Sequence, residues 1–535
     1  MRFLALNFDV LALVCSHLHH ADALALALTS KTQPLHALAL ARVPARVRLR
    51  DAAQLCTLWA RADDNDNAAR VRSLSVAADA FEVGKSKWEG RSLSADHVDF
   101  LTDILVSTTV LTHLDLALSG LLAHNARIEP VVTSMQALVH LDLRQFSTNA
   151  LNLIQNLSGP LETLHVDYHG ARPHCPPDLS PLLAVALSYK SLRALSILAP
   201  QSSPPHEPRP IFLAPHAALR TLVFSSSDIL PADVLEACFR LDALVLGSVS
   251  RLPYDHDLLQ PLRQLSVGHA DLLRLVNQKR ISTVRYLHVR TSDELDTGLG
   301  PDLLHALHEI SPLGLHIHIP FRPSDHQWAV DVNAAAPRLR CLTLHLYPAF
   351  PHPHNGGFEQ RFAQWLRDIC ALFSPLALIA LRLHIPAVSL ALCAETFAPY
   401  DPTTANAVFD ASGGPHPRLA SNLVATATTA LLYGLARSMP TLRYIAFSTS
   451  VPAPVEHCRD EMYDGHGEQK GTCWWRIQSV PPTEGPAEGG HPDGGEDPDR
   501  KLVWIAGEEG ERVWREVLDA ADEAAVAEVV RRSAV

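Results

Sequence analysis

The chain has 535 residues, 47% of them hydrophobic, and a formal net charge of −12 at pH 7. This length exceeds what one hydrophobic core usually supports, so several units or a repeating fold are expected. The negative charge argues against nucleic-acid partners, because phosphate contacts need clustered Lys and Arg. The sequence contains no run of about 18 uncharged apolar residues, so it predicts neither a membrane-spanning helix nor a membrane partner.

The cysteines and the first residues predict where the protein resides. The nine cysteines are scattered and never form a C-x-x-C pair, which is typical of reduced thiols rather than of a disulfide framework. The apolar start of the chain is interrupted by Asn7 and Asp9, which argues against a secretion signal. A cytoplasmic and/or nuclear location is expected.

The first fifty residues predict three short helices. Apolar residues recur at spacings of three and four from Leu6 to Leu18, and Asp22 can cap a second apolar run. The segment 35–43 predicts the third helix. Helices this short bury too little area to fold alone, so we expect the module to dock against another surface.

The segment from about 6 to 43 resembles an F-box, especially the fungal form that precedes leucine-rich repeats. The resemblance is carried by L-x-F-D-V-L from Leu6, S-H-L from Ser16, A-D from Ala21, L-A-L-T-S-K from Leu26 and L-H-A-L from Leu35, with Asn7 where the family usually has proline. It implies docking to the Skp-type adaptor of a cullin–RING ubiquitin ligase. The adaptor-binding residues it implies are Leu6, Phe8, Asp9, Val10, Leu11, Val14, Leu18 and Leu26. The alternative is a helical cap without adaptor binding, because every solenoid needs a cap.

One phrase, L-x-x-L-x-(aliphatic or Phe), returns eight times between residues 111 and 289. Its middle apolar position falls at 114, 141, 164, 195, 222, 244, 265 and 287. These intervals match the leucine-rich repeat, whose period is about 20 to 29 residues. Fourth and sixth positions of the phrase point to one side of a strand, and third and fifth positions to the other. The predicted fold is therefore an α/β repeat solenoid, an irregular leucine-rich-repeat horseshoe with a parallel sheet.

The strand positions that point away from the apolar side form a candidate recognition surface. Neighbouring parallel strands lie about 4.8 Å apart, so we expect His113 to meet His140 and Asp115 to meet Asp142. A solenoid binds partners through its concave sheet. The candidate surface for an unidentified protein target comprises His113, Asp115, His140, Asp142, His165, Asp167, Gln264, Tyr286, His288 and Arg290. The alternative is a solvated sheet without a ligand.

Two groups of histidines have the chemistry of metal ligands. Imidazole and carboxylate groups between His113 and Asp167 are suitable for zinc, but ladder positions project in parallel whereas a metal needs convergent ligands. The histidines of LHIHIP, LHLY and LHIP (within 315–386) are on predicted strands, where hydrogen-bonded or exposed histidines are commoner than ligands. We expect neither a metal nor a cofactor.

Beyond Val289 the repeat loosens. LGLHIHIP, LRCLTL, LIALRL and LRYIAF still predict strands between 313 and 447, but their intervals grow to 39 and 64 residues. The segment 448–500 contains an acidic, Pro/Gly-rich run that predicts a mobile loop, flanked by two antiparallel strands at 473–480 and 501–506. Apolar spacing from 508 to 535 predicts one amphipathic helix. The paired strands and this helix are expected to cap the open end of the solenoid together.

These patterns divide the chain into five predicted regions. They are an F-box-like helical module (1–45), a connecting region with a first degenerate repeat (46–110), the irregular solenoid (111–447), a strand with the acidic loop (448–500), and a C-terminal strand with a capping helix (501–535).

Known catalytic motifs are absent from the sequence, which lacks a P-loop, a dinucleotide fingerprint, H-E-x-x-H and G-x-S-x-G. The first hypothesis is therefore a non-enzymatic substrate-recognition subunit of a Skp–cullin–F-box-type ubiquitin ligase. The second is a leucine-rich-repeat scaffold without a ubiquitin role. The third, a repeat-fold enzyme, would require a pocket with convergent acid and base groups.

Overall fold

The protein is described by a computed structural model in two compact units. Unit 1 comprises Met1–Leu241 with Val249–His256, and unit 2 comprises Asp242–Ser248 with Asp257–Val535. The structure describes residues 8–17, 23, 25–26, 45–49, 54, 56–57, 71–76, 82–83, 92–93, 95–117, 121–146, 150–168, 179–199, 213–225, 232–247, 262–277, 284–290, 300–321, 326–348, 365, 368–386, 432, 435–450, 472–479, 500–505, 507–520 and 523–533.

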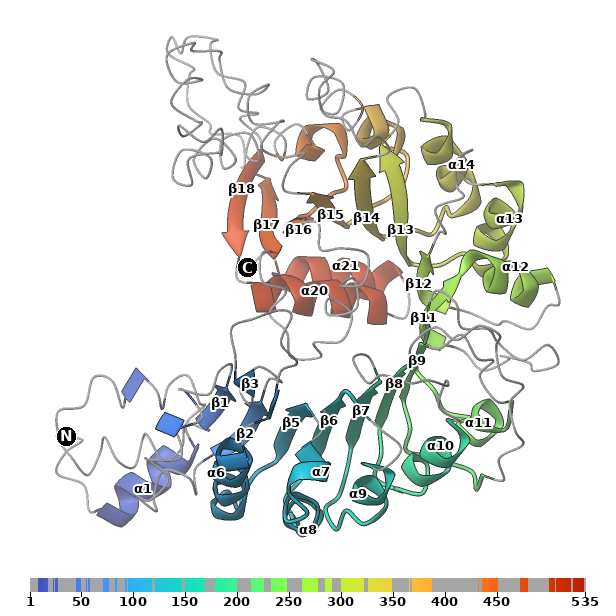
Figure 1. Cartoon of the computed structure of the whole chain (residues 1–535). Helices are drawn as coiled ribbons and strands as arrows, with labels where there is room; N and C mark the ends of the chain where they lie inside the picture. Colours follow the sequence, from blue (N-terminus) through green and yellow to red (C-terminus); the bar gives the residue numbers. More distant parts are fainter. Residues whose placement is uncertain are drawn as a thin grey trace, which may run out of the picture. The chain divides into compact units, whose positions relative to one another are not determined.

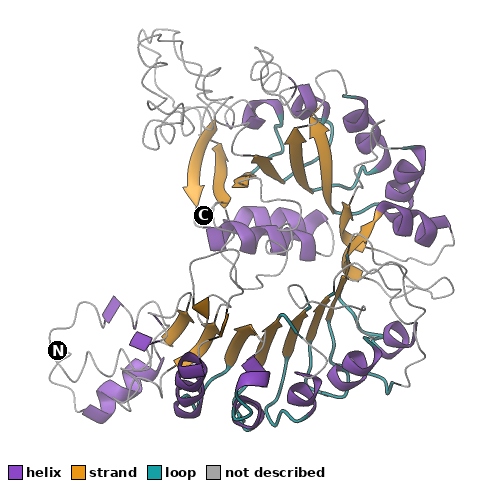
Figure 2. Ribbon diagram, viewed as in Figure 1, coloured by secondary structure: helices purple, strands orange, loops and turns teal. Residues whose placement is uncertain are grey.

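Unit 1 repeats a strand followed by a helical segment (Figures 1 and 2). Its parallel strands lie in chain order: β1 (Ala45–Leu49), β2 (Val71–Val76), β5 (His113–Ala117), β6 (His140–Arg144), β7 (Thr163–Asp167), β8 (Ala194–Leu198) and β9 (Thr221–Ser225). A short antiparallel pair joins β3 (Glu82–Val83) to β4 (Ser92–Leu93). The described helices are α1 (Phe8–His17), α6 (Ala95–Ser107), α7 (Leu121–His124), α8 (Ile128–Thr133), α9 (Leu151–Gln155), α10 (Ser180–Ala186) and α11 (Ala232–Ala237).

The core of unit 1 is built by the repeated phrase. Its fourth-position leucines are in register from strand to strand, and so are its sixth-position residues, from Leu116 to Phe224. None of these side chains is more than 1% exposed. Because each strand points these residues to the same side, stacked copies share one apolar layer. The prediction that the repeated leucines stack on neighbouring strands is confirmed.

Unit 2 continues the same pattern and ends differently. Seven strands lie in parallel: β10 (Ala243–Leu246), β11 (Leu262–Gly268), β12 (Val284–Arg290), β13 (Gly314–Phe321), β14 (Cys341–Pro348), β15 (Ala380–Pro386) and β16 (Tyr444–Ser450). Two antiparallel strands follow, β17 (Thr472–Ser479) and β18 (Arg500–Ile505). The helices of this unit whose bounds lie within the described residues are α12 (His269–Asn277), α13 (Pro301–Ile310), α14 (Gln327–Ala335), α20 (Gly507–Asp519) and α21 (Glu523–Ser533). Both units are therefore α/β and solenoid-like, with mostly parallel sheets.

The C-terminal helices do not cap the sheet edge as the sequence predicted. The segment forms two helices, α20 and α21, and these lie across the strands on the side opposite α12–α14 (Figure 1). We call the side of each unit's sheet that carries third-, fifth- and seventh-position residues its ladder face. On the ladder face of unit 2, α20 and α21 join one apolar core whose members include Cys341, Ala380, Tyr444, Trp474, Val513, Trp514, Val517, Leu518, Val526 and Val529. The predicted antiparallel strands are present, and β18 takes the place at the end of the strand order.

Small residues create the space that α20 occupies. The third-position row of unit 2 runs from Tyr286 through Gly314, Cys341 and Ala380 to Tyr444. A Cβ atom on Gly314 would lie 2.6 Å from Leu518 Cδ2 of α20 and 2.7 Å from a ring carbon of Tyr286. Such distances are too short for two carbon atoms, so glycine is required by close approach here. The three small side chains form a trough that admits the helix.

Truncation of a stacked leucine is expected to destabilise unit 1. Leu164 is fully buried, so Leu164→Ala should lower the free energy of unfolding by about 2–5 kcal/mol, measured by urea denaturation. Val106 on α6 is 52% exposed, and Val106→Ala should change this free energy by less than about 0.5 kcal/mol. Equal effects of the two substitutions would contradict the buried ladder.

Parts of the predicted organisation lie outside the described residues, among them the third N-terminal helix at 35–43 and the acidic loop that precedes β18. In the described parts of the chain, the helices are all too short or too polar to span a bilayer.

Candidate functional site

The ladder face of unit 1 carries the first predicted target-binding residues. His113 pairs in register with His140 and Asp115 with Asp142, as the sequence predicted. The two imidazole rings stack with their centroids 4.0 Å apart. These side chains and those of His165 and Asp167 are half-buried, because neighbours in the ladder cover part of each group (residues 113–167).

A hydrogen-bonded network joins the acidic groups of this face. Arg144 Nη2 donates to Asp115 Oδ2 at 2.7 Å and lies 3.8 Å from Asp142 Oδ2. Ser75 Oγ donates to Asp115 Oδ2 at 2.6 Å. His165 Nδ1 is 2.7 Å from Ser196 Oγ. Arg144 was missing from the predicted surface, although its seventh-position place on β6 puts it on the same side as Asp142.

The ladder face of unit 2 differs from the prediction. Tyr286 is partly buried against the α20 core, with its ring edge-on to Trp514 at 6.3 Å between centroids. His288 is only 4% exposed. Neither residue lies on an open recognition surface, because α20 and neighbouring histidines cover them. Gln264 is half-buried, and the side chain of Arg290 lies outside the described residues.

Five histidines gather on the ladder face of unit 2, and we call them the histidine cluster: His288, His316, His318, His345 and His384. The register places His288 beside His316, His318 beside His345, and His345 beside His384. Ring centroids are 4.0 Å apart for His288–His316, 4.5 Å for His318–His345 and 5.5 Å for His345–His384. Fifth and seventh positions of adjacent strands thus bring imidazoles from four strands together.

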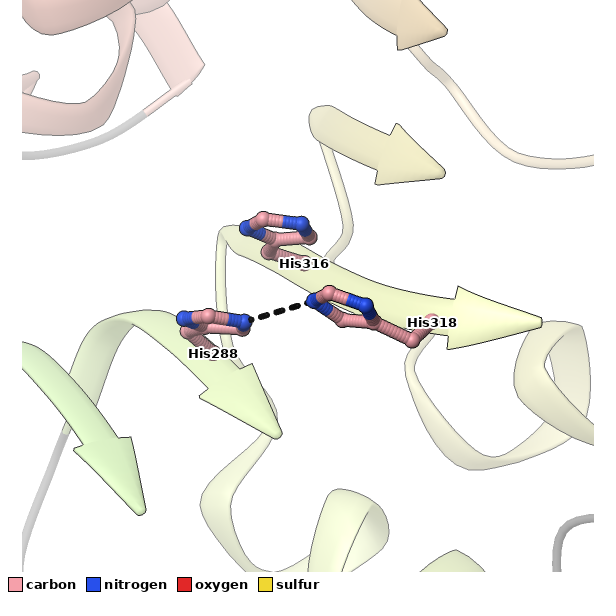
Figure 3. A group of neighbouring side chains, drawn as sticks. All are labelled: His288, His316 and His318. Carbon is pink, nitrogen blue, oxygen red and sulfur yellow. Dashed lines mark hydrogen bonds between the residues drawn. The ribbon is translucent and has the colours of Figure 1, made fainter. Parts of the chain in front are cut away.

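Hydrogen bonds order one end of the histidine cluster. His288 Nε2 lies 3.2 Å from His318 Nε2 (Figure 3). His288 Nδ1 lies 3.0 Å from the hydroxyl of Ser266, which is fully buried on the neighbouring strand β11. His316 stacks on His288 with an interplanar angle of 8°, and its Nε2 atom is buried without a hydrogen-bond partner.

Burial disfavours the protonated form of three members of the histidine cluster. It lowers the pKa of His316 well below its ordinary value, and the neighbouring His288 and His318 lower it further. Burial also lowers the pKa of His384 well below its ordinary value, with a further contribution from the charge of Arg382. The pKa of His345 is lowered by burial as well. Neutral imidazoles retain a lone pair, so they can accept hydrogen bonds or bind a metal ion.

Arg382 fastens α20 beside the histidine cluster. Its guanidinium lies over the rings of Trp474 and Trp514, at 5.1 and 4.8 Å from their centroids. It donates to Glu511 Oε1 of α20 at 2.6 Å, and its side chain is only 9% exposed. Cation–π contacts and a charge-assisted hydrogen bond in such a site hold the helix on the sheet.

Three members of the histidine cluster have the composition of a metal site. One ring nitrogen each of His288, His316 and His318 lies within 4.8 Å of the other two. By contrast, the histidines and aspartates between His113 and Asp167 on unit 1 form no such group among the described residues. Sequence reasoning missed this cluster because it ended the ladder rows at His288. Extending the fifth- and seventh-position rows into LHIHIP, LHLY and LHIP would have placed these histidines beside His288.

Five of the predicted adaptor-binding residues belong to α1: Phe8, Asp9, Val10, Leu11 and Val14. Within this helix Val10 is 43% exposed, Leu11 is buried, and Val14 is half-buried. Leu26 is half-buried. Phe8 and Asp9 begin α1, but their side chains lie outside the description, as do Leu6 and Leu18 entirely. Sequence reasoning did not select Leu13, which is 61% exposed.

Comparison with known proteins adds no relative. No protein-family model matches the chain, and no curated protein matches its sequence.

Proposed function

We propose that the chain is a substrate-recognition subunit of a Skp–cullin–F-box-type ubiquitin ligase, a fungal-type F-box protein with irregular leucine-rich repeats. The observation that carries the proposal is the exposed apolar strip on α1. Val10 and Leu13 are 43% and 61% exposed, whereas Leu11 and Cys15 of the same helix are buried. The helix is therefore packed on one side and offers apolar side chains on another.

The spacing on α1 makes this strip suitable for a helix-binding partner. Residues three apart lie on the same side of a helix, so Val10 and Leu13 form one contiguous patch. Full burial of a Val or Leu side chain contributes about 1.5–3 kcal/mol. Docking of a Skp-type adaptor over both residues would gain this free energy, and the adaptor would connect the chain to a cullin.

The ladder face of unit 1 is the proposed surface for the protein target. It presents imidazole, carboxylate and guanidinium groups in fixed register, held by the Asp115–Arg144 contact and its neighbours. Polar groups held in one geometry favour specific partners over unspecific ones. Bound to this face, a target is tethered at high effective concentration near the ubiquitin-charged enzyme, and the chemistry takes place on other subunits.

Adaptor co-purification tests the proposal. The double substitution Val10→Asp/Leu13→Asp should reduce affinity for a Skp-type adaptor at least 100-fold, because two buried contacts become buried charges. Affinity is measured by pull-down and calorimetry with full-length chains. Val106→Asp is the matched control, since Val106 is an exposed apolar residue on α6 of the same unit. Adaptor binding that is absent in the wild type, or unchanged by the double substitution, would contradict the proposal.

A second candidate is a leucine-rich-repeat interaction scaffold without a ubiquitin role. It is favoured by the burial of Leu11, Cys15 and Ala23, because a helical cap needs only a buried side. This candidate predicts that Val10→Asp/Leu13→Asp leaves target capture by the ladder face of unit 1 unchanged and that no adaptor co-purifies.

A further inference from the structure

His288, His316 and His318 lie on two adjacent strands, β12 and β13, with one ring nitrogen of each within 4.8 Å of the other two (Figure 3). We propose that these three side chains form a binding site for a divalent transition-metal cation, and that Zn²⁺ is the ion it is best suited to hold. The site is independent of adaptor binding and of the proposed ubiquitin-ligase role.

The distance between two of the nitrogens is that of ligands in a tetrahedral zinc site. Zn–N bonds of about 2.0–2.1 Å in a tetrahedral site place the ligand nitrogens about 3.3 Å apart. His288 Nε2 and His318 Nε2 are 3.2 Å apart. Without a cation, one of the two nitrogens must carry a proton for this contact to be a hydrogen bond. The two rings are nearly coplanar and meet head-on, so a tilt of both rings would turn their lone pairs to a cation beside the line that joins the nitrogens.

Ser266 supports this role as a positioning residue. Its hydroxyl lies 3.0 Å from His288 Nδ1 and is enclosed in the core between β10 and β12. When Nδ1 donates its proton to this hydroxyl, the lone pair of His288 is at Nε2, the atom that faces His318. Metal-binding histidines usually have such a partner on the second ring nitrogen, which fixes both the tautomer and the ring orientation.

The third ligand requires a ring rotation. His316 is stacked nearly parallel to His288, so the plane of its ring does not pass through a cation held between His288 and His318. Its nitrogen is nevertheless within 4.8 Å of the other two, and its Nε2 atom has no hydrogen bond to lose. Rotation about the side-chain torsions would bring this nitrogen to the cation and break the stack. Three protein ligands leave a fourth position open to water or to a group of a bound partner.

The chemistry of the site selects the class of ion. Imidazole nitrogens suit Zn²⁺, Cu²⁺ and Ni²⁺, whereas Ca²⁺ and Mg²⁺ prefer oxygen ligands. An anion would need charged donors, but the guanidinium of Arg382, two residues before His384 on β15, is paired with Glu511. Three imidazoles with one ring nitrogen each within 4.8 Å of the other two therefore favour a cation.

Zinc titration of the full-length chain tests the site. The chain is stripped with EDTA and titrated with Zn²⁺ against a chromogenic chelator. The wild type should bind one Zn²⁺ ion per chain more tightly than His288→Gln/His318→Gln does. This double substitution should raise the dissociation constant of that ion at least tenfold. Ser266→Ala should raise it about tenfold while leaving all three ligands in place. The matched control is His305→Gln/His308→Gln, which removes two exposed histidines of α13 and should leave the dissociation constant unchanged.

Cobalt spectroscopy gives a second readout that does not depend on how the variants fold. Co²⁺ bound to the wild type should show the intense visible absorption of a four-coordinate site, and Zn²⁺ should displace it. Weak octahedral absorption, or the same zinc affinity in the wild type and in His288→Gln/His318→Gln, would overturn the proposal. Far-UV circular dichroism checks that the substituted chains are folded, so that weaker zinc binding reports the ligands.

Discussion

Replacing Trp514 with alanine is expected to lower the free energy of unfolding of unit 2 by about 3–5 kcal/mol. The indole is only 5% exposed, and it contacts three large groups: Trp474 at 6.0 Å and Tyr286 at 6.3 Å between ring centroids, and the guanidinium of Arg382 at 4.8 Å. Its removal leaves a cavity between α20 and the sheet and deprives a buried cation of one of its two aromatic partners.

The position of α20 can be followed directly. Hydrogen exchange with mass spectrometry should show faster exchange of peptides within Gly507–Asp519 in Trp514→Ala, and urea denaturation measures the stability. Trp504 on β18 is the matched control because it is 64% exposed, so Trp504→Ala should change stability by less than about 0.5 kcal/mol. A stable Trp514→Ala protein with unchanged exchange in α20 would show that this helix does not depend on the indole.

Acidification is expected to destabilise unit 2 from about pH 6.5 downwards. Burial lowers the pKa of His316 and of His384 in the folded state, whereas both have ordinary values when unfolded. Below about pH 6.5 the unfolded chain therefore binds more protons, so stability is complete above this pH and decreases as the pH falls. Each of the two histidines is expected to contribute on the order of 1 kcal/mol of this loss by pH 5.5.

Urea denaturation at pH 7.5 and pH 5.5, with EDTA present, measures this loss. Carboxylates with ordinary pKa values remain charged over this range, so histidines dominate the change. His316→Gln/His384→Gln should flatten the dependence on pH, whereas His305→Gln/His308→Gln on the exposed side of α13 should preserve it. Equal stability of the wild type at the two pH values would contradict a neutral, buried cluster.

The backbone pattern could be predicted because it depends on local periodicity. Alternation of Leu114 and Leu116 with polar neighbours identifies one buried side of a strand, and equal repeat lengths place such sides in line. The same reasoning gave the correct partners for His113 and Asp115. It also identified the strands of unit 2 up to Tyr444, although the intervals between them became long.

The covering of the unit 2 ladder face could not be predicted from local pattern. The amphipathic segment from residue 508 indicated a helix with one apolar side, but periodicity does not say which surface that side meets. A cap on the sheet edge and a helix laid on the sheet both bury it. The deciding information is the loss of side-chain volume at Gly314, Cys341 and Ala380, which becomes meaningful only when these residues are placed in one row.

The histidine cluster was missed for a related reason. Its members come from four strands separated by up to about a hundred residues, so each looked like a single histidine on a strand (His288–His384). Considered singly, a strand histidine is more often a satisfied structural residue than a ligand. The pairing register of β12–β15 places these histidines next to one another, so they must be considered as a group.

The trough under α20 has a consequence for the shape of partners that unit 1 accepts. A helix reaches the sheet of unit 2 because glycine, cysteine and alanine follow one another there, and the corresponding row of unit 1 instead carries Ser73, His113, His140 and Thr163. Two stacked rings in that row hold an approaching helix away from the strands. We therefore expect ligands of unit 1 to be extended peptides or loop tips, which can contact the stacked rings without approaching the strands as closely as α20 does in unit 2.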